Sequence, residues 1–185
     1  MTLPPGLTAS DDASAARPLH LLDRDALPDW LEKQPQQVRD WVAAHAFDAS
    51  PGAWLTLAGD DGGPAAILGV GDRLDPFSYA HAPFSLPAGD WRLAEAVNGD
   101  EQAALALGWG LGSYRFDRYC KAPRDPARLA IDVDADTAAV ISACRRVRDL
   151  VNAPTQEMGP AELEAAAREL ADAHGGQLES IVGEE

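Results

Sequence analysis

Strand-like and helix-like segments alternate along this chain of 185 residues, and the alternation constrains the fold more than any other feature. The clearest strands are residues 53–57 and 65–70, which flank a turn at 59–63. The Asp-Gly and Gly-Gly steps of that turn supply the positive φ angles that tight hairpins need. Further strands are predicted at 18–23, 91–96 and 129–133. Helices between these strands predict an α/β fold with a mixed β-sheet flanked by helices.

Capping residues and prolines predict where the first helices begin. Asp25 is expected to cap a short helix that runs through Leu31. Pro35 suits the first turn of a second helix, which would direct Trp41 and Val42 inward.

The middle of the chain carries two further predicted helices. Residues 76–81 favour a short helix that ends before Pro83. Asp100 is expected to cap the next helix, on which Gly108 and Gly112 lie four residues apart. Small residues at this spacing allow a helix backbone to approach a sheet closely, at some cost in helix propensity.

A long helix is predicted to open at Asp134 or Asp136 and to end before Pro154. Four apolar residues recur on one of its faces, which is therefore predicted to be buried: Val140, Cys144, Val147 and Val151. A buried thiol is the favoured interpretation of Cys144.

The last helix has strong signals at both ends. Gly159 and Pro160 suit its N-cap and first position, Glu162 can complete a capping box, and Gly175 can stop it. Residues 178–182 then favour a strand, for which the chain offers no further element as a neighbour.

These elements predict four regions. Residues 1–17, rich in Pro, Ser, Ala and Asp, are expected to form a flexible N-terminal arm. Residues 18–133 form an α/β domain, 134–152 a linker helix, and 153–185 the start of a further domain that is cut short.

Charge and composition exclude several functions. The net charge of −15 repels phosphate backbones, so no nucleic-acid partner is expected. The sequence has no secretory signal and no apolar run long enough to span a bilayer, so a soluble, cytoplasmic protein without a membrane partner is predicted. Two cysteines give no disulfide framework.

No motif assigns a catalytic, cofactor-binding or metal-binding residue to this chain. Asp132, Asp134 and Asp136 open with calcium-loop spacing but lack the later Gly and Glu, so helix capping is favoured. Residues 108–113 lack the third glycine of a dinucleotide loop, and the four histidines are scattered. Cys120 beside Lys121 is more typical of an ordinary cysteine than of an activated thiol.

Residues 113–119 are dense in aromatic and charged side chains. They could form a nucleic-acid patch, although packing of the aromatic residues and pairing of the charges is favoured in so acidic a chain. With Lys121, residues 111–119 are similar to the Gly-x-Tyr-x-Phe-x-x-Tyr-Lys stretch that closes the N-terminal domain of leucyl (cytosol) aminopeptidases. Residues 148–160 resemble the family's Arg-x-Leu-x-Asn-x-Pro-x-x-x-Met-Thr-Pro, with Gly159 in place of Thr.

The resemblance implies an N-terminal accessory domain with a macro-domain-like fold, followed by the linker helix and the start of the catalytic domain. Family members remove N-terminal residues from peptides with two divalent metals, commonly zinc or manganese, held by a catalytic domain whose motifs are absent here. The implied partners are the chain's own catalytic domain and a hexamer, with peptide substrate bound only by the complete protein. This chain alone is therefore predicted to be inactive and to hold no cofactor.

Two other functions stay open at this point. A macro-like fold could bind a small molecule of the nucleotide type, although no Gly-rich phosphate loop supports this and fold does not imply function. A nucleic-acid-binding regulatory role is known for some relatives, but the net charge of −15 argues against it.

Overall fold

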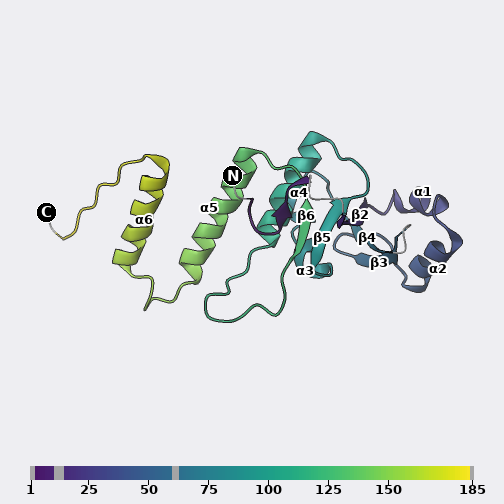
Figure 1. Ribbon diagram of the computed structural model, residues 1–185, viewed down its shortest axis with the longest axis horizontal. Coiled ribbons are helices and arrows are strands. Elements are labelled where there is room, and N and C mark those ends of the chain that lie inside the picture. Colours follow the sequence, from purple (N-terminus) through teal and green to yellow (C-terminus); the bar gives the residue numbers. More distant parts are fainter. Residues whose placement is uncertain (1–2, 11–14, 60–62, 184–185) are drawn as a thin grey trace. The chain divides into compact units, whose positions relative to one another are not determined.

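The computed structural model describes residues 3–10, 15–59 and 63–183. The chain divides into two compact units, Met1–Ala143 and Cys144–Glu185, and the long helix α5 runs from the first into the second. The elements up to α5, most of which are labelled in Figure 1, lie in this order: β1 (Leu7–Thr8), β2 (Arg17–Leu22), α1 (Leu27–Glu32), α2 (Gln36–Ala44), β3 (Trp54–Ala58), β4 (Pro64–Gly69), η2 (Pro76–Ser78), α3 (Ala82–Ser85), β5 (Gly89–Leu93), α4 (Gly99–Gly112), β6 (Ala127–Ala130) and α5 (Ala135–Asn152). Helix α6 (Pro160–His174) belongs to the second unit.

Six strands form one sheet in the order β1-β6-β5-β2-β4-β3. All neighbours are parallel except the hairpin β3–β4, which is the antiparallel pair that the turn signals predicted. The mixed sheet with flanking helices is therefore confirmed. Strand β2 lies between β5 and β4, so the chain leaves it toward one side through α1 and α2 and returns to its other side as β5.

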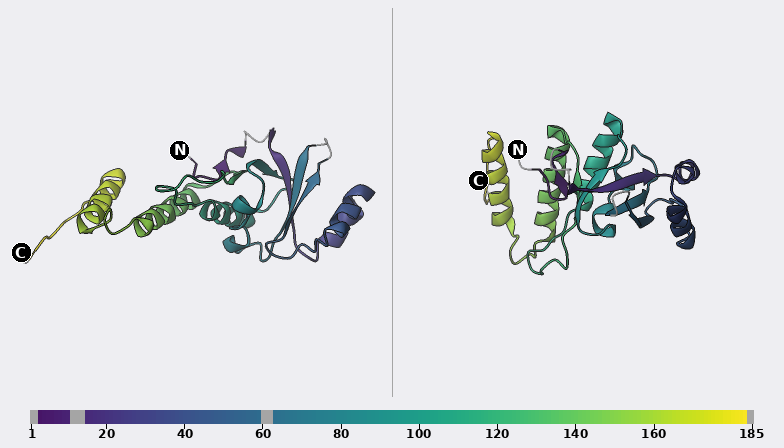
Figure 2. Two further views of the ribbon diagram at one scale, coloured as in Figure 1. Left: turned by 90° about the horizontal axis from the view of Figure 1, so that it is seen from below. Right: turned by 45° about the vertical axis from the view of Figure 1, so that its right-hand side comes forward.

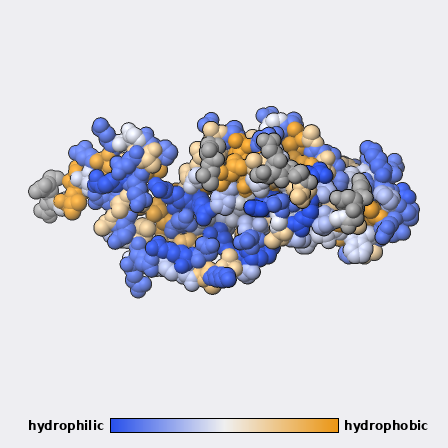
Figure 3. All heavy atoms as spheres, viewed as in Figure 1, coloured by the Kyte–Doolittle hydropathy of each residue, from blue (hydrophilic) through white to orange (hydrophobic). Residues whose placement is uncertain are grey.

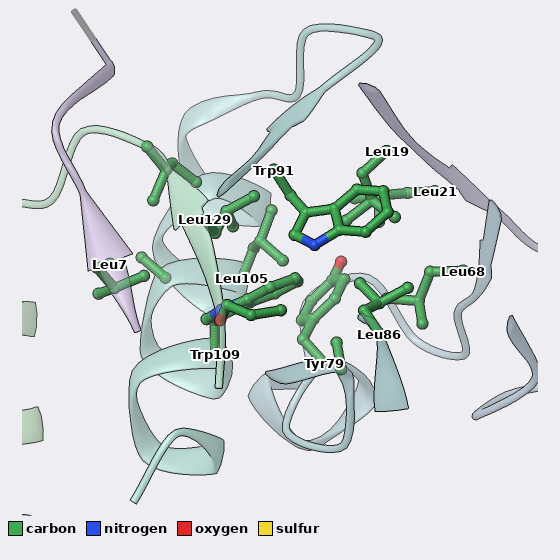
Figure 4. Packing of buried hydrophobic residues seen from close by; sticks show 14 of the residues in the cluster. Leu7, Leu19, Leu21, Leu68, Tyr79, Leu86, Trp91, Leu105, Trp109 and Leu129 are labelled. Atoms are coloured by element: carbon green, nitrogen blue, oxygen red, sulfur yellow. The ribbon is translucent and has the colours of Figure 1, made fainter. Parts of the chain in front are cut away.

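One face of the sheet packs against α4 and α3 through the larger hydrophobic core (Figures 2 and 4). Trp91 from β5, Trp109 from α4 and Tyr79 are fully buried in it. Each carries one polar group into the core, and each group is hydrogen-bonded. The indole N–H groups of Trp91 and Trp109 donate to the Pro87 and Ala127 carbonyls, both at 3.0 Å, and the Tyr79 hydroxyl donates to the Arg73 carbonyl at 2.9 Å. Burial raises the pKa of Tyr79, so this hydroxyl stays a donor.

The opposite face is covered by α1 and α2 over β2, β4 and β3 only. Leu22, Ile67 and Val42 are central to this second cluster. The predicted inward direction of Val42 is confirmed, but Trp41 is 47% exposed. Its indole N–H donates to the Thr56 carbonyl at 2.9 Å, so it lies along the outer edge of β3.

Two predicted caps are wrong. At α1 the N-cap is Ala26, which has helical geometry and no side-chain cap, and the Asp23 carboxylate accepts from the Ala26 N–H in the turn before the helix. At α4 the N-cap is Asn98 instead of Asp100, and its side chain accepts from the Glu101 N–H at 2.9 Å. Asn98 has the extended entry geometry that a cap needs.

The predictions around Pro83 and the α4 glycines also need correction. Pro83 does not end a helix; it lies in the first turn of α3, where a missing N–H costs nothing. Gly108 and Gly112 allow a close approach, but the neighbour is the Pro76–Ala80 backbone instead of the sheet. A methyl group at either position would overlap a backbone carbonyl, of Pro76 or of Ala80.

Helix α5 begins as predicted, because the Asp134 carboxylate accepts from the Thr137 N–H at 2.8 Å. The prediction of its buried face is wrong. Ala138 and Ile141 are its buried residues, whereas the predicted apolar face is largely exposed: Val140 48%, Val147 58% and Val151 77%.

Strand β1 lies inside the segment expected to be a flexible arm. Leu7 pairs with Leu129 of β6 and is only 6% exposed, so the sheet extends by one strand that the sequence pattern did not predict. In the second unit, Gly175 ends α6 in the left-handed conformation with φ 67°, as expected. Residues 178–182, predicted to form a strand, have no regular structure.

Candidate functional site

The acidic segment 132–136 serves the fold. Asp134 caps α5, and Asp132 accepts from the Ser10 hydroxyl at 2.6 Å, which ties the β1 segment to the end of β6. Across residues 3–10, 15–59 and 63–183, no three His, Cys, Asp or Glu side chains converge into a set that could hold a metal ion. The described residues therefore do not fit the two-metal centre of an aminopeptidase, and no step of metal chemistry is assigned to them.

In the aromatic and charged segment 113–119, aromatic packing is found as the favoured interpretation predicted, but Arg115 contacts a ring instead of making the predicted ion pair. Phe116 and Tyr119 make an edge-to-face contact at 5.6 Å. Arg115 lies over the Phe84 ring, 4.4 Å from its centroid. Cys120 is exposed and Cys144 half-buried, and both are free thiols, so the expected full burial of Cys144 is not found.

A crevice runs along β2 on the face that α1 and α2 leave partly open. It consists of two adjoining hollows of about 600 and 440 Å³, which share His20, Trp30, Gln34 and Glu95. It reaches the carboxyl ends of β2 and β5, where the chain turns in opposite directions from neighbouring parallel strands. Open α/β sheets characteristically bind ligands at such a switch point.

The imidazole of His20 is the best-defined chemical group in the crevice. Its Nδ1 lies 2.7 Å from the Glu95 carboxylate, and its ring meets the Trp30 ring edge-on at 5.1 Å. A carboxylate at Nδ1 orients the ring, and in the neutral imidazole it favours the proton on Nδ1, which leaves Nε2 as the acceptor. No serine, threonine or cysteine lies among the described lining residues, so the crevice offers a polar binding surface without a hydroxyl or thiol nucleophile.

Beside the crevice an ion pair holds the entry of α4. Arg73 Nη1 donates to the Glu101 carboxylate at 2.6 Å, and its Nη2 donates to the Leu21 carbonyl at 2.9 Å. The Glu101 side chain is only 8% exposed. This ion pair and the bond to Glu101 raise the pKa of Arg73, against the opposing effect of burial, so it stays charged. Neither His20–Glu95 nor Arg73–Glu101 had a local sequence signal, since their partners lie far apart along the chain.

The second unit presents apolar side chains to solvent. Val147 and Val151 of α5 and Leu163 and Leu170 of α6 are each 46% exposed or more. Figure 3 shows apolar patches among the mainly hydrophilic surface of this region. Ala153 is the only buried residue among the described residues of this unit. Its helices carry the ion pairs Arg146–Glu169 and Arg168–Glu164 but no hydrophobic core of their own.

None of the helices in the described part of the chain has the length and apolar content needed to cross a membrane. Residues 17–132 match the family model of the M17 aminopeptidase N-terminal domain. The chain belongs to this family. The match confirms what the two motifs indicated, and the motif at 111–119 lies inside it at the end of α4.

Relatives of the M17 aminopeptidase N-terminal domain show how much of a longer protein it corresponds to. A probable cytosol aminopeptidase of Leifsonia xyli subsp. xyli is 31% identical over 153 residues, which cover 70% of this chain and 31% of that protein. The crystal structure of the cytosol aminopeptidase from Coxiella burnetii matches with a TM-score of 0.77 and 28% identity, over 86% of this chain and 36% of the other.

A more distant structure shares the fold. The bottromycin maturation enzyme BotP, in complex with Mn, matches with a TM-score of 0.59 and 23% identity, over 88% of this chain and 37% of that one. The chain thus spans about a third of the length of these relatives.

Proposed function

We propose that this chain acts as the non-catalytic N-terminal accessory part of a leucyl (cytosol) aminopeptidase, an exopeptidase that removes N-terminal residues from peptides. The observation that carries the proposal is the exposed apolar surface of the second unit, together with the family of the first. An aminopeptidase catalytic domain is the partner that would cover this surface.

The physical reason is the lack of a core in the second unit. Helices of this length are marginal in water unless an apolar face is packed. Val147, Val151, Leu163 and Leu170 are exposed by 58%, 77%, 55% and 46%. Complete burial of such a side chain contributes about 1.5–3 kcal/mol, so covering the exposed part of these four contributes several kcal/mol. A docked catalytic domain therefore stabilises this unit, and the unit in turn joins the two domains.

The finer features of the proposal come from the relatives. The catalytic domain holds two divalent metals, zinc or manganese; the complex of BotP with Mn supports manganese as one of them. The complete protein works in the cytoplasm, in line with the name of the cytosol aminopeptidase relatives. Its assembly as a hexamer is proposed from the family resemblance alone. The macro-domain-like description of the sheet stays a prediction.

The test compares two proteins on leucine p-nitroanilide with added Mn²⁺ or Zn²⁺. One is the 185-residue chain, and the other is a chimera in which these residues replace the matching N-terminal part of the Leifsonia xyli aminopeptidase. We expect hydrolysis only by the chimera. Hydrolysis by the 185-residue chain itself would overturn the non-catalytic role.

Docking is tested by Leu163→Lys in both proteins. The substitution should leave the unfolding midpoint of the isolated chain unchanged, because Leu163 is 55% exposed there, and should lower that of the chimera. Leu74→Lys is the matched control, since Leu74 is 60% exposed on the first unit. Equal effects of the two substitutions in the chimera would contradict docking through this face.

A further inference from the structure

Residues 114–126, between α4 and β6, form a segment that we call the basic loop. It carries four basic and two acidic side chains, a net charge of +2, in a chain whose net charge is −15. Its exposed tip includes Tyr119, which is 52% exposed. Arginine and tyrosine are enriched at protein–protein interfaces, and a local positive charge on an acidic protein favours an acidic partner.

Two arginines of the basic loop lie against the Phe84 ring of α3, at 4.4 Å for Arg115 and 5.9 Å for Arg124. Arg124 is satisfied within the fold, because its guanidinium donates to the Leu86 carbonyl at 2.8 Å and also to the Phe84 carbonyl. Arg124 therefore has a structural role and anchors the loop to α3.

Arg115 differs from its neighbour. Its Nη1 is buried and finds no hydrogen-bond acceptor among the described residues. A buried donor without an acceptor is costly, and a charged one more so, because it has lost its water without gaining a partner. The guanidinium is held in place by the Phe84 ring and yet lacks the acceptor that this position requires.

A second unsatisfied group lies next to the same platform. His81 Nε2 is buried and has no partner among the described residues, and His81 is three residues before Phe84. Burial lowers the pKa of His81, so the ring is neutral near pH 7 and its Nε2 can donate to an acceptor. The surroundings of α3 therefore present two buried nitrogen atoms without an acceptor.

We infer that Arg115 is the anchor of an interface and binds a carboxylate carried by the catalytic domain of the aminopeptidase. The inference rests on the proposed function and adds a specific contact to it. A carboxylate matches the guanidinium in charge and geometry, since it can accept two parallel hydrogen bonds from it. A protein carboxylate is favoured over a free ion because the loop also offers exposed aromatic surface around Tyr119.

The test compares the effect of Arg115→Met on the unfolding midpoint of two proteins, in which opposite directions of change are expected. In the 185-residue chain, Arg115→Met removes an unsatisfied charge, so the unfolding midpoint should stay the same or rise. In the chimera it removes one partner of a buried ion pair, so the midpoint should fall, by about 5 °C. Arg115→Lys keeps the charge but loses the planar guanidinium, so it should lower the midpoint of the chimera by less than Arg115→Met does. Arg118→Met in the same exposed loop is the matched control, with little effect in either protein.

Each outcome bears on the inference separately from the proposed function. Unfolding of the chimera is measured whether or not it hydrolyses leucine p-nitroanilide. If the chimera is active but its midpoint does not change with Arg115→Met, the inference is wrong and the proposed function still holds. A midpoint for Arg115→Met in the isolated chain that falls by more than the loss of the Phe84 ring contact explains also overturns it, because the guanidinium then has an acceptor within the chain. Stabilisation of the isolated chain by acetate, lost in Arg115→Met, would instead identify a small-anion site.

Discussion

Removing the cation of the Arg73–Glu101 pair should destabilise the first unit far more than removing an exposed cation. The Arg73 side chain is 34% exposed and that of Glu101 is 8% exposed, with 2.6 Å between Nη1 and Oε1. Arg73→Met leaves the carboxylate buried and unpaired. Breaking a fully buried pair costs about 3–5 kcal/mol. The partial exposure of Arg73 and the position of Glu101 at a helix N-terminus reduce this to roughly 2–3 kcal/mol.

The assay is urea unfolding at pH 7, followed by tryptophan fluorescence, because Trp91 and Trp109 are fully buried in the same unit. Arg24→Met is the matched control. Arg24 pairs with Asp48 at 3.0 Å, but the two side chains are 64% and 57% exposed, so its loss should cost less than about 1 kcal/mol.

A second substitution separates charge from packing. Glu101→Gln in the Arg73→Met background removes the unpaired charge and should recover at least half of the lost stability, because the neutral amide is cheaper to bury. Equal losses for Arg73→Met and Arg24→Met, or no recovery in the double variant, would refute the view that an uncompensated buried carboxylate dominates the effect.

Three further substitutions test the fold. Leu7→Ala should destabilise the chain by about 2 kcal/mol in urea unfolding if β1 is a true strand, whereas the exposed Leu74→Ala should change it by less than about 0.5 kcal/mol. Gly108→Ala should cost about 1–3 kcal/mol because its methyl group meets the Pro76 carbonyl, and Gly99→Ala, with open space around it, should cost nothing measurable. Burial lowers the folded-state pKa of His81 below 6.5, so the unfolded state binds its proton more tightly; stability should fall as pH drops below about 6.5, and His81→Leu should flatten that part of the pH profile.

Local chemistry explains what the sequence predicted correctly. The β3–β4 hairpin follows from a glycine-rich turn between two apolar segments, and the capping box of α6 from Gly159 and Glu162, whose carboxylate accepts from the Gly159 N–H at 3.0 Å. In each case the interacting groups lie close together along the chain. The alternation of strands and helices, and thus the mixed α/β sheet, follows from the same kind of local information.

Contacts between segments far apart in the sequence explain the features that the sequence did not predict. Strand β1 has two residues, too few for any periodicity, and exists because Leu7 and Thr8 pair with β6 more than a hundred residues later. The His20–Glu95 pair of the crevice is likewise made by the pairing of β2 with β5. At the start of α4 two Asx residues compete, and Asn98 caps instead of Asp100 because its backbone is extended.

The exposed face of α5 is the most instructive difference between prediction and structure. Its apolar residues recur at helical spacing. Such periodicity predicts that one face of the helix is buried, but it does not indicate which part of the protein or of a partner covers that face. Ile141 finds its partners within the first unit, whereas Val147 and Val151, about two and three turns further on, do not. Arg115 presents the same situation in polar form: a side chain held in a defined place without the acceptor it needs. Unsatisfied apolar and polar groups are costly for different physical reasons, so the two observations support the proposed docking of a catalytic domain independently of each other.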